Sequence, residues 1–362
     1  MITRLNYLTL TLILFFNSAL IGVAAPFFHQ EGNGYEPHSG QSIFDLIHQE
    51  EEVVNMTLIG EMDSFIHIRK TRDYSKADLT YIDGTGVERK YQVKVKPRGK
   101  FRRRVCDFPP LKLKFSKDEL EAAGLSKHND LKLVTHCMED KEYNESLILK
   151  EYLTYKMYNE LTPNSFRVQL VNITYQDRND PTNSINQYGF LIEDVDEMAD
   201  RMGGKECDDC IGLSLDKVKM NHERLMSMFQ YMIGNLDYSI EMNRNVKMIE
   251  MEKDVFIPVP YDFDFSVLIG APYLKPNIEV GQTVDMERIF TGHAKEADEL
   301  YSTMAYFKTK KKALIEIIRE FEYLSKAERF EMIGYLRGFF NQLVSSDRDE
   351  AIHFGEKNVD TK

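Results

Sequence analysis

The chain has 362 residues, of which 43% are hydrophobic and 29% are charged, a composition typical of an ordinary globular protein. Its formal net charge of -12 argues against nucleic acid as a general partner, because phosphate backbones are bound by surplus cations. The length is sufficient for a body of two lobes with a substantial core.

The first 25 residues have the layout of a secretory signal peptide. Arg4 precedes an apolar stretch over 5–23, and small residues provide a cleavage site near Ala24. A membrane anchor is the alternative, since the stretch approaches the roughly 20 residues that span a bilayer. We expect a protein that is secreted or held in the periplasm or cell envelope, with no transmembrane domain after cleavage of the signal.

Residues 26–50 are mostly polar, and we expect a flexible N-terminal segment there. Residues 51–195 are expected to form a sheet lobe with one main helix. Apolar and polar residues alternate between turn signals, which predicts a small, mainly antiparallel sheet. The predicted strands are 53–60, 64–70, 77–86, 90–99, 110–115, 130–137, 166–177 and 187–198; the predicted helices are 116–125 and the amphipathic 144–161.

Residues 196–350 are expected to form a mostly helical lobe that carries a metal site. A helix predicted over 221–235 precedes a strand pair at 245–250 and 255–265, and long periodic segments follow over 285–345. The order of elements therefore predicts an α+β protein of two lobes, a small antiparallel-sheet lobe followed by a mostly helical lobe.

Four cysteines lie downstream of the predicted signal peptide. Cys106 and Cys137 flank a strand-like region, and Cys207 and Cys210 form a C-x-x-C pair. Because paired cysteines in an oxidising compartment usually form disulfides, we expect structural pairing, with a Cys106–Cys137 bond that joins two strands. A zinc site built from all four cysteines is the alternative.

The stretch PYDFDFS, 260–266, places two carboxylates two residues apart in an aromatic and apolar run. An ionised carboxylate resists burial unless a positive group compensates it. A divalent metal ion would provide that compensation. Asp262 is therefore a candidate metal ligand, and Asp264 is a second ligand or a supporting acid.

Asp237 and Asn245 extend this set. Phosphoryl transfer needs one carboxylate to accept the proton of the attacking hydroxyl, and an amide oxygen with another carboxylate to hold magnesium. Asp237 at the end of a helix, Asn245 at the start of a strand and Asp262 after the next strand fit these roles in this order. Taken singly, each also fits an ordinary structural role, as a turn cap, a strand start or a loop acid.

Three upstream residues are candidates for the nucleotide site. Lys112 and Lys114 share one face of a strand, and Glu151 lies in the middle of the helix predicted over 144–161. The alternatives are two lysines on a solvated face, and a Glu151 that forms an ion pair along its own helix.

Five segments together resemble the spore-coat protein H (CotH) kinases, a family of atypical protein kinases. They are KPRGKFRRRVCDFPPLKLKF, LILKEYLTYKMY, YGFLIEDVDEM, MIGNLDYSIEMNRNVKMI and IPVPYDFDFS, and the resemblance covers about residues 53–345. It implies a reduced protein-kinase-like fold of two lobes. It also implies metal-dependent transfer of phosphate from ATP, with Mg²⁺ or Mn²⁺, to hydroxyl groups of a protein substrate.

The resemblance also implies residue roles. Asp237 falls on the catalytic-loop aspartate, Asn245 on the metal-binding asparagine, and Asp262 on the aspartate that replaces the usual kinase magnesium ligand. The residues that it places at the nucleotide phosphates or in the segment between the lobes are Lys112 or Lys114, Gly189 and Glu193, of which Glu193 is taken as cofactor-binding.

Two other classes of function are compatible with the sequence. A non-catalytic surface or assembly protein, built as a degenerate kinase, fits the acidic balance, the absence of a G-x-G-x-x-G loop from the sequence and the replacement of basic residues after Asp237 by Tyr238, Ser239 and Ile240. A metal-dependent hydrolase that uses Asp262 and Asp264 is less well supported, because no histidine-rich ligand set accompanies them.

Overall fold

The computed structural model describes residues 40–49, 52–66, 73–99, 102–106, 108–137, 141–276, 282, 287–294 and 297–345. The predicted signal peptide, 1–25, and most of the predicted flexible segment lie outside these residues. Within the part of the chain that is described, no helix is both long and apolar enough to cross a membrane.

Helix α1 (Ile43–Ile47) lies inside the segment 26–50, and for these residues the prediction of a flexible segment is wrong. Ser42 and Asp45 form a capping box in which each side chain accepts a hydrogen bond from the other's backbone N–H. Ile43, Phe44 and Ile47 of α1 are fully buried in the core of the barrel described next, and Leu46 is partly buried against it. Burial of these side chains and a satisfied N-terminus hold the short helix in place.

Seven strands form a closed barrel in the order β1-β2-β3-β4-β5-β7-β6. Neighbouring strands are antiparallel except β1 and β6, whose parallel pairing closes the barrel. The predicted sheet is therefore mainly antiparallel, but its closure is not predicted. The strands are β1 (Val54–Gly60), β2 (Ser75–Ile82), β3 (Glu88–Pro97), β4 (Leu111–Lys114), β5 (Asp130–Val134), β6 (Val168–Asp177) and β7 (Ser184–Ile192).

Strands β4 and β5 show how alternation sorts the side chains. Leu111 and Leu113 are fully buried in the barrel core, as are the leucines of β5. The lysines between them therefore lie on the outer face. Lys112 pairs in register with Lys132 on β5, so two cations lie side by side on that face.

Residues 62–66 form helix α2 (Met62–Ile66), so the strand predicted over 64–70 is wrong at its start. The side chain of Asp177 accepts a hydrogen bond of 2.9 Å from the backbone N–H of Met62. Phe65 is fully buried, and its ring lies so near Gly60 that a Cβ there would be 2.4 Å away. This close contact, made possible by a glycine, cannot be read from local alternation.

A small second sheet has the order β10-β9-β8, and helices α6 and α7 contact it. The predicted helices at 116–125, 144–161 and 221–235 are confirmed, and the end of the strand predicted over 187–198 is instead helical, capped by Asp194. The elements are α3 (Arg102–Val105), α4 (Lys117–Ala122), α5 (Lys141–Leu161), α6 (Val195–Met202), β8 (Lys205–Glu206), η1 (Leu215–Lys217), α7 (Met220–Ile233), β9 (Val246–Glu252), β10 (Val255–Pro260), α8 (Ala297–Arg319) and α9 (Lys326–Ser345).

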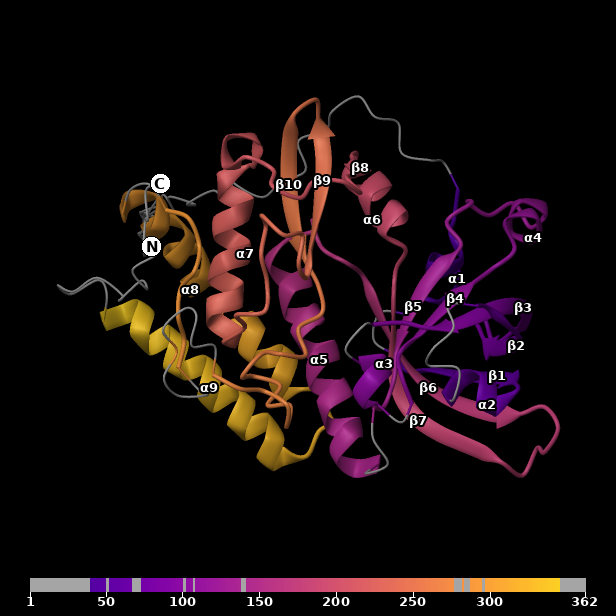
Figure 1. Ribbon diagram of the computed structural model, residues 1–362. Helices are drawn as coiled ribbons and strands as arrows, with labels where there is room; N and C mark the ends of the chain where they lie inside the picture. Colours follow the sequence, from indigo (N-terminus) through magenta and orange to yellow (C-terminus); the bar gives the residue numbers. More distant parts are fainter. Residues whose placement is uncertain are drawn as a thin grey trace, which may run out of the picture.

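Helix α5 joins the two halves of the molecule. It runs between the barrel on one side and helices α7, α8 and α9 on the other (Figure 1), and it contacts both β7 and α8. Its buried side chains belong to one hydrophobic core with those of the C-terminal helices. The predicted α+β class is confirmed, but the halves are a closed barrel and a helical part that share a core across α5.

Two disulfides are present, Cys106–Cys137 and Cys207–Cys210. The predicted structural pairing is confirmed, including the bond between Cys106 and Cys137. The alternative of a four-cysteine zinc site is wrong, because all four sulfurs are consumed. Cys106 follows α3 directly and Cys137 follows β5, so the bond fixes α3 to the end of β5 near the start of α5.

Candidate active site

The segment after β10 places Asp262 and Asp264 on different sides of a buried anchor. Phe263 between them is fully buried and packs against aromatic rings of α5 and α7, with ring centroids 4.7 Å from Tyr155 and 5.5 Å from Phe229. Such aromatic packing stabilises beyond the area that it buries. The anchor fixes the short loop, and the two carboxylates meet different surroundings.

Asp262 has a strained backbone that the fold holds in place. Its φ is +62°, a left-handed conformation that a residue with a side chain rarely adopts. Its backbone N–H donates a 2.8 Å hydrogen bond to the hydroxyl of Tyr155 on α5. Strain of this kind persists only where the surroundings enforce it, and it concentrates at functional sites. The Asp262 side chain is 37% exposed, so its carboxylate can be reached from solvent.

Asp237 and Asn245 are brought together as the sequence predicts. Asp237 follows α7, and its N–H donates 3.0 Å to the side chain of Asn235, which is itself buried. The amide nitrogen of Asn245 donates to the backbone oxygen of Asp237 at 2.7 Å and to its carboxylate Oδ2 at 2.9 Å. With its nitrogen engaged in this way, Asn245 keeps its amide oxygen as an acceptor.

The hairpin of β9 and β10 carries Asp262 to the same place. Val246 pairs with Pro260, and beyond that pair the N–H of Tyr261 donates 3.0 Å to the backbone oxygen of Asn245. Asn245 and Asp262 therefore lie at the same end of the hairpin. Burial raises the pKa of Asp237; Asp262 adds to the rise, and Arg244, 3.4 Å away, opposes it. Asp237 and Asp262 are thus near enough to repel each other.

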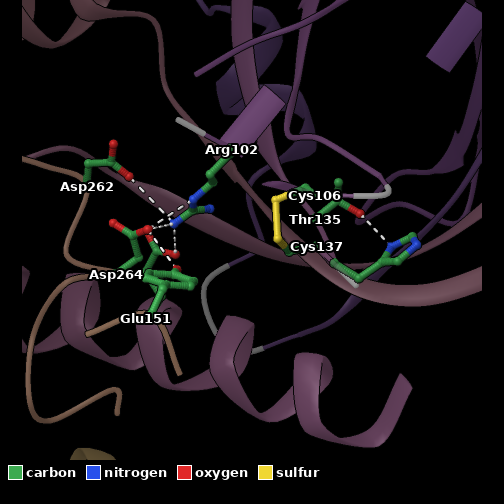
Figure 2. The surroundings of a disulfide bond; sticks show 9 residues. Arg102, Cys106, Thr135, Cys137, Glu151, Asp262 and Asp264 are labelled. Atoms are coloured by element: carbon green, nitrogen blue, oxygen red, sulfur yellow. Dashed lines mark hydrogen bonds and ion pairs between the residues drawn. A yellow bond between two sulfur atoms is a disulfide. The ribbon is translucent and has the colours of Figure 1, made fainter. Parts of the chain in front are cut away.

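Asp264 lies in a different environment, formed around Arg102 of α3 (Figure 2). The guanidinium Nη2 is 2.9 Å from Asp264, 3.0 Å from Glu151 of α5 and 3.6 Å from Asp262. Tyr273 also donates to Asp264 at 2.9 Å. The side chains of Asp264 and Glu151 are only 7% and 4% exposed. Arg102 therefore supplies the positive charge that these buried acids require.

Burial and the short distances between these side chains shift the pKa values of Arg102, Glu151 and Asp264. Burial raises the pKa of Glu151 and of Asp264, and Arg102 opposes the rise in each. Burial alone would lower the pKa of Arg102, but the three carboxylates raise it well above its ordinary value. The guanidinium stays charged, and the acids around it are held by an internal cation.

Lys132 on β5 is a site residue that the sequence reasoning missed. Its ammonium lies over the rings of Phe166 and Tyr261, 4.9 and 5.0 Å from their centroids. Burial lowers its pKa to about 7; Arg98 and Lys247 lower it further, and Glu206 and Asp194 oppose them. Lys132 lies on the strand directly before α5, the helix that carries Glu151. A lysine on the strand before this helix could therefore have been recognised in the sequence as a candidate site residue.

Lys132 belongs to a basic group at the junction of the two halves. Arg98 follows β3, and Lys247 lies on β9 opposite Val259, with an ion pair to Glu206. Burial raises the pKa of Tyr155 and of Tyr261, the residues that flank Asp262 in space and in sequence, and Arg98 opposes the rise in both. A cationic group therefore adjoins the acidic residues of the hairpin end.

Lys112 and Lys114, the predicted nucleotide-binding lysines, lie on the outer face of β4. Their ammonium groups are 2.5 and 3.8 Å from Asp130. Lys114, Asp130 and Asp194 line a polar hollow of about 780 Å³. Asp130 and Lys132 share one face of β5, but Lys132 does not line the hollow. Lys112 lies directly opposite Lys132, and Lys114 lies farther along the strand face, opposite Asp130.

The surroundings of Glu193 and Gly189 give both residues a structural role. Glu193 is fully buried, and its carboxylate accepts hydrogen bonds from the side chains of Arg167, at 2.8 Å, and Arg201, at 2.7 Å. Gly189 lies within β7, where a Cβ would be 2.8 Å from the carbonyl oxygen of Val134. Since two arginines already compensate Glu193, we leave it out of the proposed nucleotide site.

The donor set at the hairpin end fits magnesium. Mg²⁺ prefers oxygen ligands, and proteins usually hold it by one or two carboxylates while it keeps waters and substrate phosphates. Asp262 and the amide oxygen of Asn245 provide such oxygens, beside Asp237. Asp264 fits less well, because Arg102 and Tyr273 already engage it. Among the residues described, no group of three or more His, Cys, Asp or Glu side chains is arranged to hold a metal.

No protein-family model matches the chain, and no curated protein matches it in sequence. Among solved structures, the chain is similar to the crystal structure of a Helicobacter pylori proinflammatory kinase, CtkA. The sequence identity is 10%, the match covers 77% of this chain and 94% of that chain, and the TM-score is 0.36. A likeness of this degree establishes neither a shared fold nor a shared activity.

Proposed function

We propose that this protein is an exported, metal-dependent phosphotransferase that moves a phosphate from ATP to hydroxyl groups of a protein substrate. One observation carries the proposal: Asp237, Asn245 and Asp262 lie at one end of the β9–β10 hairpin, beside a group of cations. Phosphoryl transfer needs this combination, because the protein mainly positions the reactants and stabilises charge. The two disulfides fit an exported protein.

Asp237 is the proposed general base. Its carboxylate orients the acceptor hydroxyl and accepts its proton as the phosphate is transferred. The hydrogen bond from Asn245 and the nearby Arg244 favour the ionised carboxylate, and burial raises its pKa. A base whose pKa is raised accepts a proton more readily, provided that it remains ionised at the working pH.

Asn245 and Asp262 are the proposed metal ligands. The bound ion would neutralise the developing charge on the phosphates. Before it binds, Asn245 is held by Asp237, and Asp262 is held by Phe263 and Tyr155. The chain thus pays little to arrange these ligands, which is the benefit of a preorganised site.

Lys132, Arg98 and Lys247 are the proposed contacts for the nucleotide phosphates. They come from β5, the end of β3 and β9, and so approach from both halves of the molecule. Burial lowers the pKa of Lys132, and repulsion from Arg98 and Lys247 lowers it further; a polyphosphate would relieve that repulsion. The hollow bordered by Lys114, Asp130 and Asp194 is the proposed place for the nucleoside.

Labelled ATP tests the proposal directly. The purified chain is incubated with γ-labelled ATP and either Mg²⁺ or Mn²⁺, and label on the protein itself or on an added protein acceptor is measured. We expect labelled protein with the wild type and none with Asp262→Ala.

Failure of the wild type to transfer phosphate, while it binds ATP with metal, would instead support the non-catalytic assembly protein. A wild type that binds neither metal nor ATP would overturn the proposed function altogether.

A further inference from the structure

We propose that Arg102 is a positioning residue of this site: it holds Asp262 in its metal-binding position by binding Asp264 and Glu151, and the Cys106–Cys137 disulfide holds Arg102 in place. The expected effect on metal-dependent nucleotide binding rests on the proposed function. The positioning itself is a property of the chain without any ligand.

The contacts of Arg102 join three separate parts of the chain. Nη2 bonds Glu151 on α5 at 3.0 Å, while Nε and Nη2 contact Asp264 after β10 at 3.1 and 2.9 Å. A planar guanidinium can serve several carboxylates at fixed angles, which a lysine ammonium cannot do in the same way. Arg102 therefore links the barrel side, α5 and the loop that carries Asp262.

Helix α5 holds the other side of the same loop. Glu151 and Tyr155 are four residues apart, on one face of the helix. Glu151 binds Arg102, and Tyr155 accepts the N–H of Asp262. The loop is thus held at Asp262 by Tyr155, at Phe263 by aromatic packing and at Asp264 by Arg102. Removal of Arg102 would leave Asp264 and Glu151 as two buried acids without a cation, and they would repel each other.

Arg102 depends in turn on the disulfide. Cys106 lies one helical turn beyond Arg102, and its N–H donates 2.8 Å to the backbone oxygen of Arg102. The bond to Cys137 fixes this turn close to α5, and Figure 2 shows the disulfide beside the guanidinium and its three carboxylates. Arg102, Cys137, Glu151 and Asp264 also line one small pocket. The covalent link therefore fixes the base from which Arg102 reaches Asp264.

A direct competition between Arg102 and the metal is the opposite hypothesis. Nη2 is 3.6 Å from Asp262, longer than its contacts with Asp264 and Glu151, and Asp262 is the more exposed acid. Arg102 thus compensates the two buried acids first and leaves the Asp262 carboxylate accessible. Positioning predicts that loss of Arg102 weakens metal binding, whereas competition predicts that it tightens metal binding.

The test compares Arg102→Gln with Arg104→Gln, a matched control that is exposed on the same short helix. Amide hydrogen exchange of residues 261–266 is measured without ligand, and MgATP and ATP affinities are measured by calorimetry. We expect Arg102→Gln to speed exchange in this loop and to weaken MgATP binding about tenfold or more, the scale of losing a supporting contact to a ligand. Binding of ATP without metal should change less than threefold, and Arg104→Gln should match the wild type.

Each other outcome has a defined meaning. Unchanged exchange in the loop, or tighter MgATP binding by Arg102→Gln, would overturn the inference. A wild type that binds no MgATP would refute the proposed function, and the exchange measurement would still decide whether Arg102 positions the loop. If Arg102→Gln does not fold, Arg102→Lys replaces it. The ammonium keeps the positive charge but lacks the planar set of donors of a guanidinium, so hydrogen exchange in the loop should become faster while the protein still folds. Exchange equal to the wild type in Arg102→Lys would likewise overturn the inference.

Discussion

Asp262 and Asp264 are two residues apart, yet they lie in two different regions of the molecule. Asp264 is enclosed with Glu151 around Arg102, and every one of these side chains is mostly buried. Asp262 lies at the hairpin end with Asp237 and Asn245, is 37% exposed and has only a distant contact with Arg102. Both regions are acidic. Arg102 contacts Asp264 and Glu151 at 2.9 and 3.0 Å but Asp262 only at 3.6 Å, and Arg244 lies 3.4 Å from Asp237.

The difference separates structural acids from candidate ligands. A buried carboxylate with a close guanidinium is already compensated, so a metal gains little there and would have to displace the arginine. A half-exposed carboxylate next to another acid keeps uncompensated negative charge, which favours a divalent cation. The spacing D-x-D alone does not show which acid has which role; the surrounding chain decides it.

The largest expected effect is on folding, in the enclosed region. Asp264→Asn should lower the free energy of unfolding by about 3 kcal/mol or more, because it leaves Arg102 with fewer partners in a buried site. Asp262→Asn should change it by less than about 1 kcal/mol, since that side chain is partly solvated. Urea unfolding followed by circular dichroism measures both. Equal losses would remove the distinction between the two acids.

Removal of the disulfide that supports Arg102 should have a similar or slightly smaller effect. For a loop of 31 residues, the chain-entropy relation gives roughly 3 to 4 kcal/mol, against roughly 2 for the short Cys207–Cys210 loop. Paired Cys→Ser variants of each disulfide, compared by urea unfolding, test this difference. If the variant without Cys106–Cys137 is no less stable than the variant without Cys207–Cys210, the Cys106–Cys137 bond does not contribute more to stability than the shorter one.

Asp237→Ala should act on transfer alone. As the proposed base, it would act on the acceptor hydroxyl and make few contacts with the nucleotide. We expect phosphate transfer to fall about 10²-fold or more, with MgATP affinity within a few-fold of the wild type. Single-turnover transfer and calorimetry, performed on the same preparation, measure the two quantities. Equal transfer rates in the wild type and Asp237→Ala would rule out its role as the base.

Lys132 should make both the stability of the protein and its affinity for ATP depend on pH. Its pKa falls from 10.5 to about 7 on folding, so between these values the unfolded chain binds more protons. The free energy of unfolding should therefore rise from pH 7 to about pH 10. Nucleotide phosphates favour the protonated ammonium, so ATP affinity should fall above pH 7, by at most about tenfold per unit.

Lys132→Arg is the matched variant for that measurement, because its charge persists across this range. Its ATP affinity should stay flat from pH 7 to pH 9, and its stability should not rise through the same window. A wild type whose ATP affinity is also flat would mean that Lys132 does not contact the phosphates. Fluorescence titration with a nucleotide analogue at each pH provides the comparison.

Local patterns predict much of this fold because they reflect local physics. Alternation places the barrel strands, and periodicity places α5 and α7. Helix α2 and the closure of the barrel escape prediction, since they depend on a contact between Phe65 and Gly60 and on the pairing of β1 with β6. The capping box of α1 is readable, but a polar composition conceals its buried residues.

The candidate site shows the same limit. The order of Asp237, Asn245 and Asp262 along the chain predicts that they converge, because a hairpin returns the chain to its starting point. Arg102 lies in a basic cluster whose members look alike in sequence, and only the disulfide and the neighbouring acids distinguish it from Arg104. Lys112 and Lys132 both lie on strands with an alternating pattern. Asp130 forms an ion pair with Lys112, whereas the ammonium of Lys132 lies over aromatic rings.

The most direct test of the difference between the two acids is calorimetric binding of ATP, with and without Mn²⁺, to Asp262→Asn and Asp264→Asn at a temperature where both are folded. We predict that Asp262→Asn loses the increase in ATP affinity that Mn²⁺ produces, whereas Asp264→Asn keeps it within about tenfold, since one carboxylate contributes directly to the metal and the other acts through Arg102. Loss of the Mn²⁺ effect in Asp264→Asn, with its retention in Asp262→Asn, would contradict this assignment.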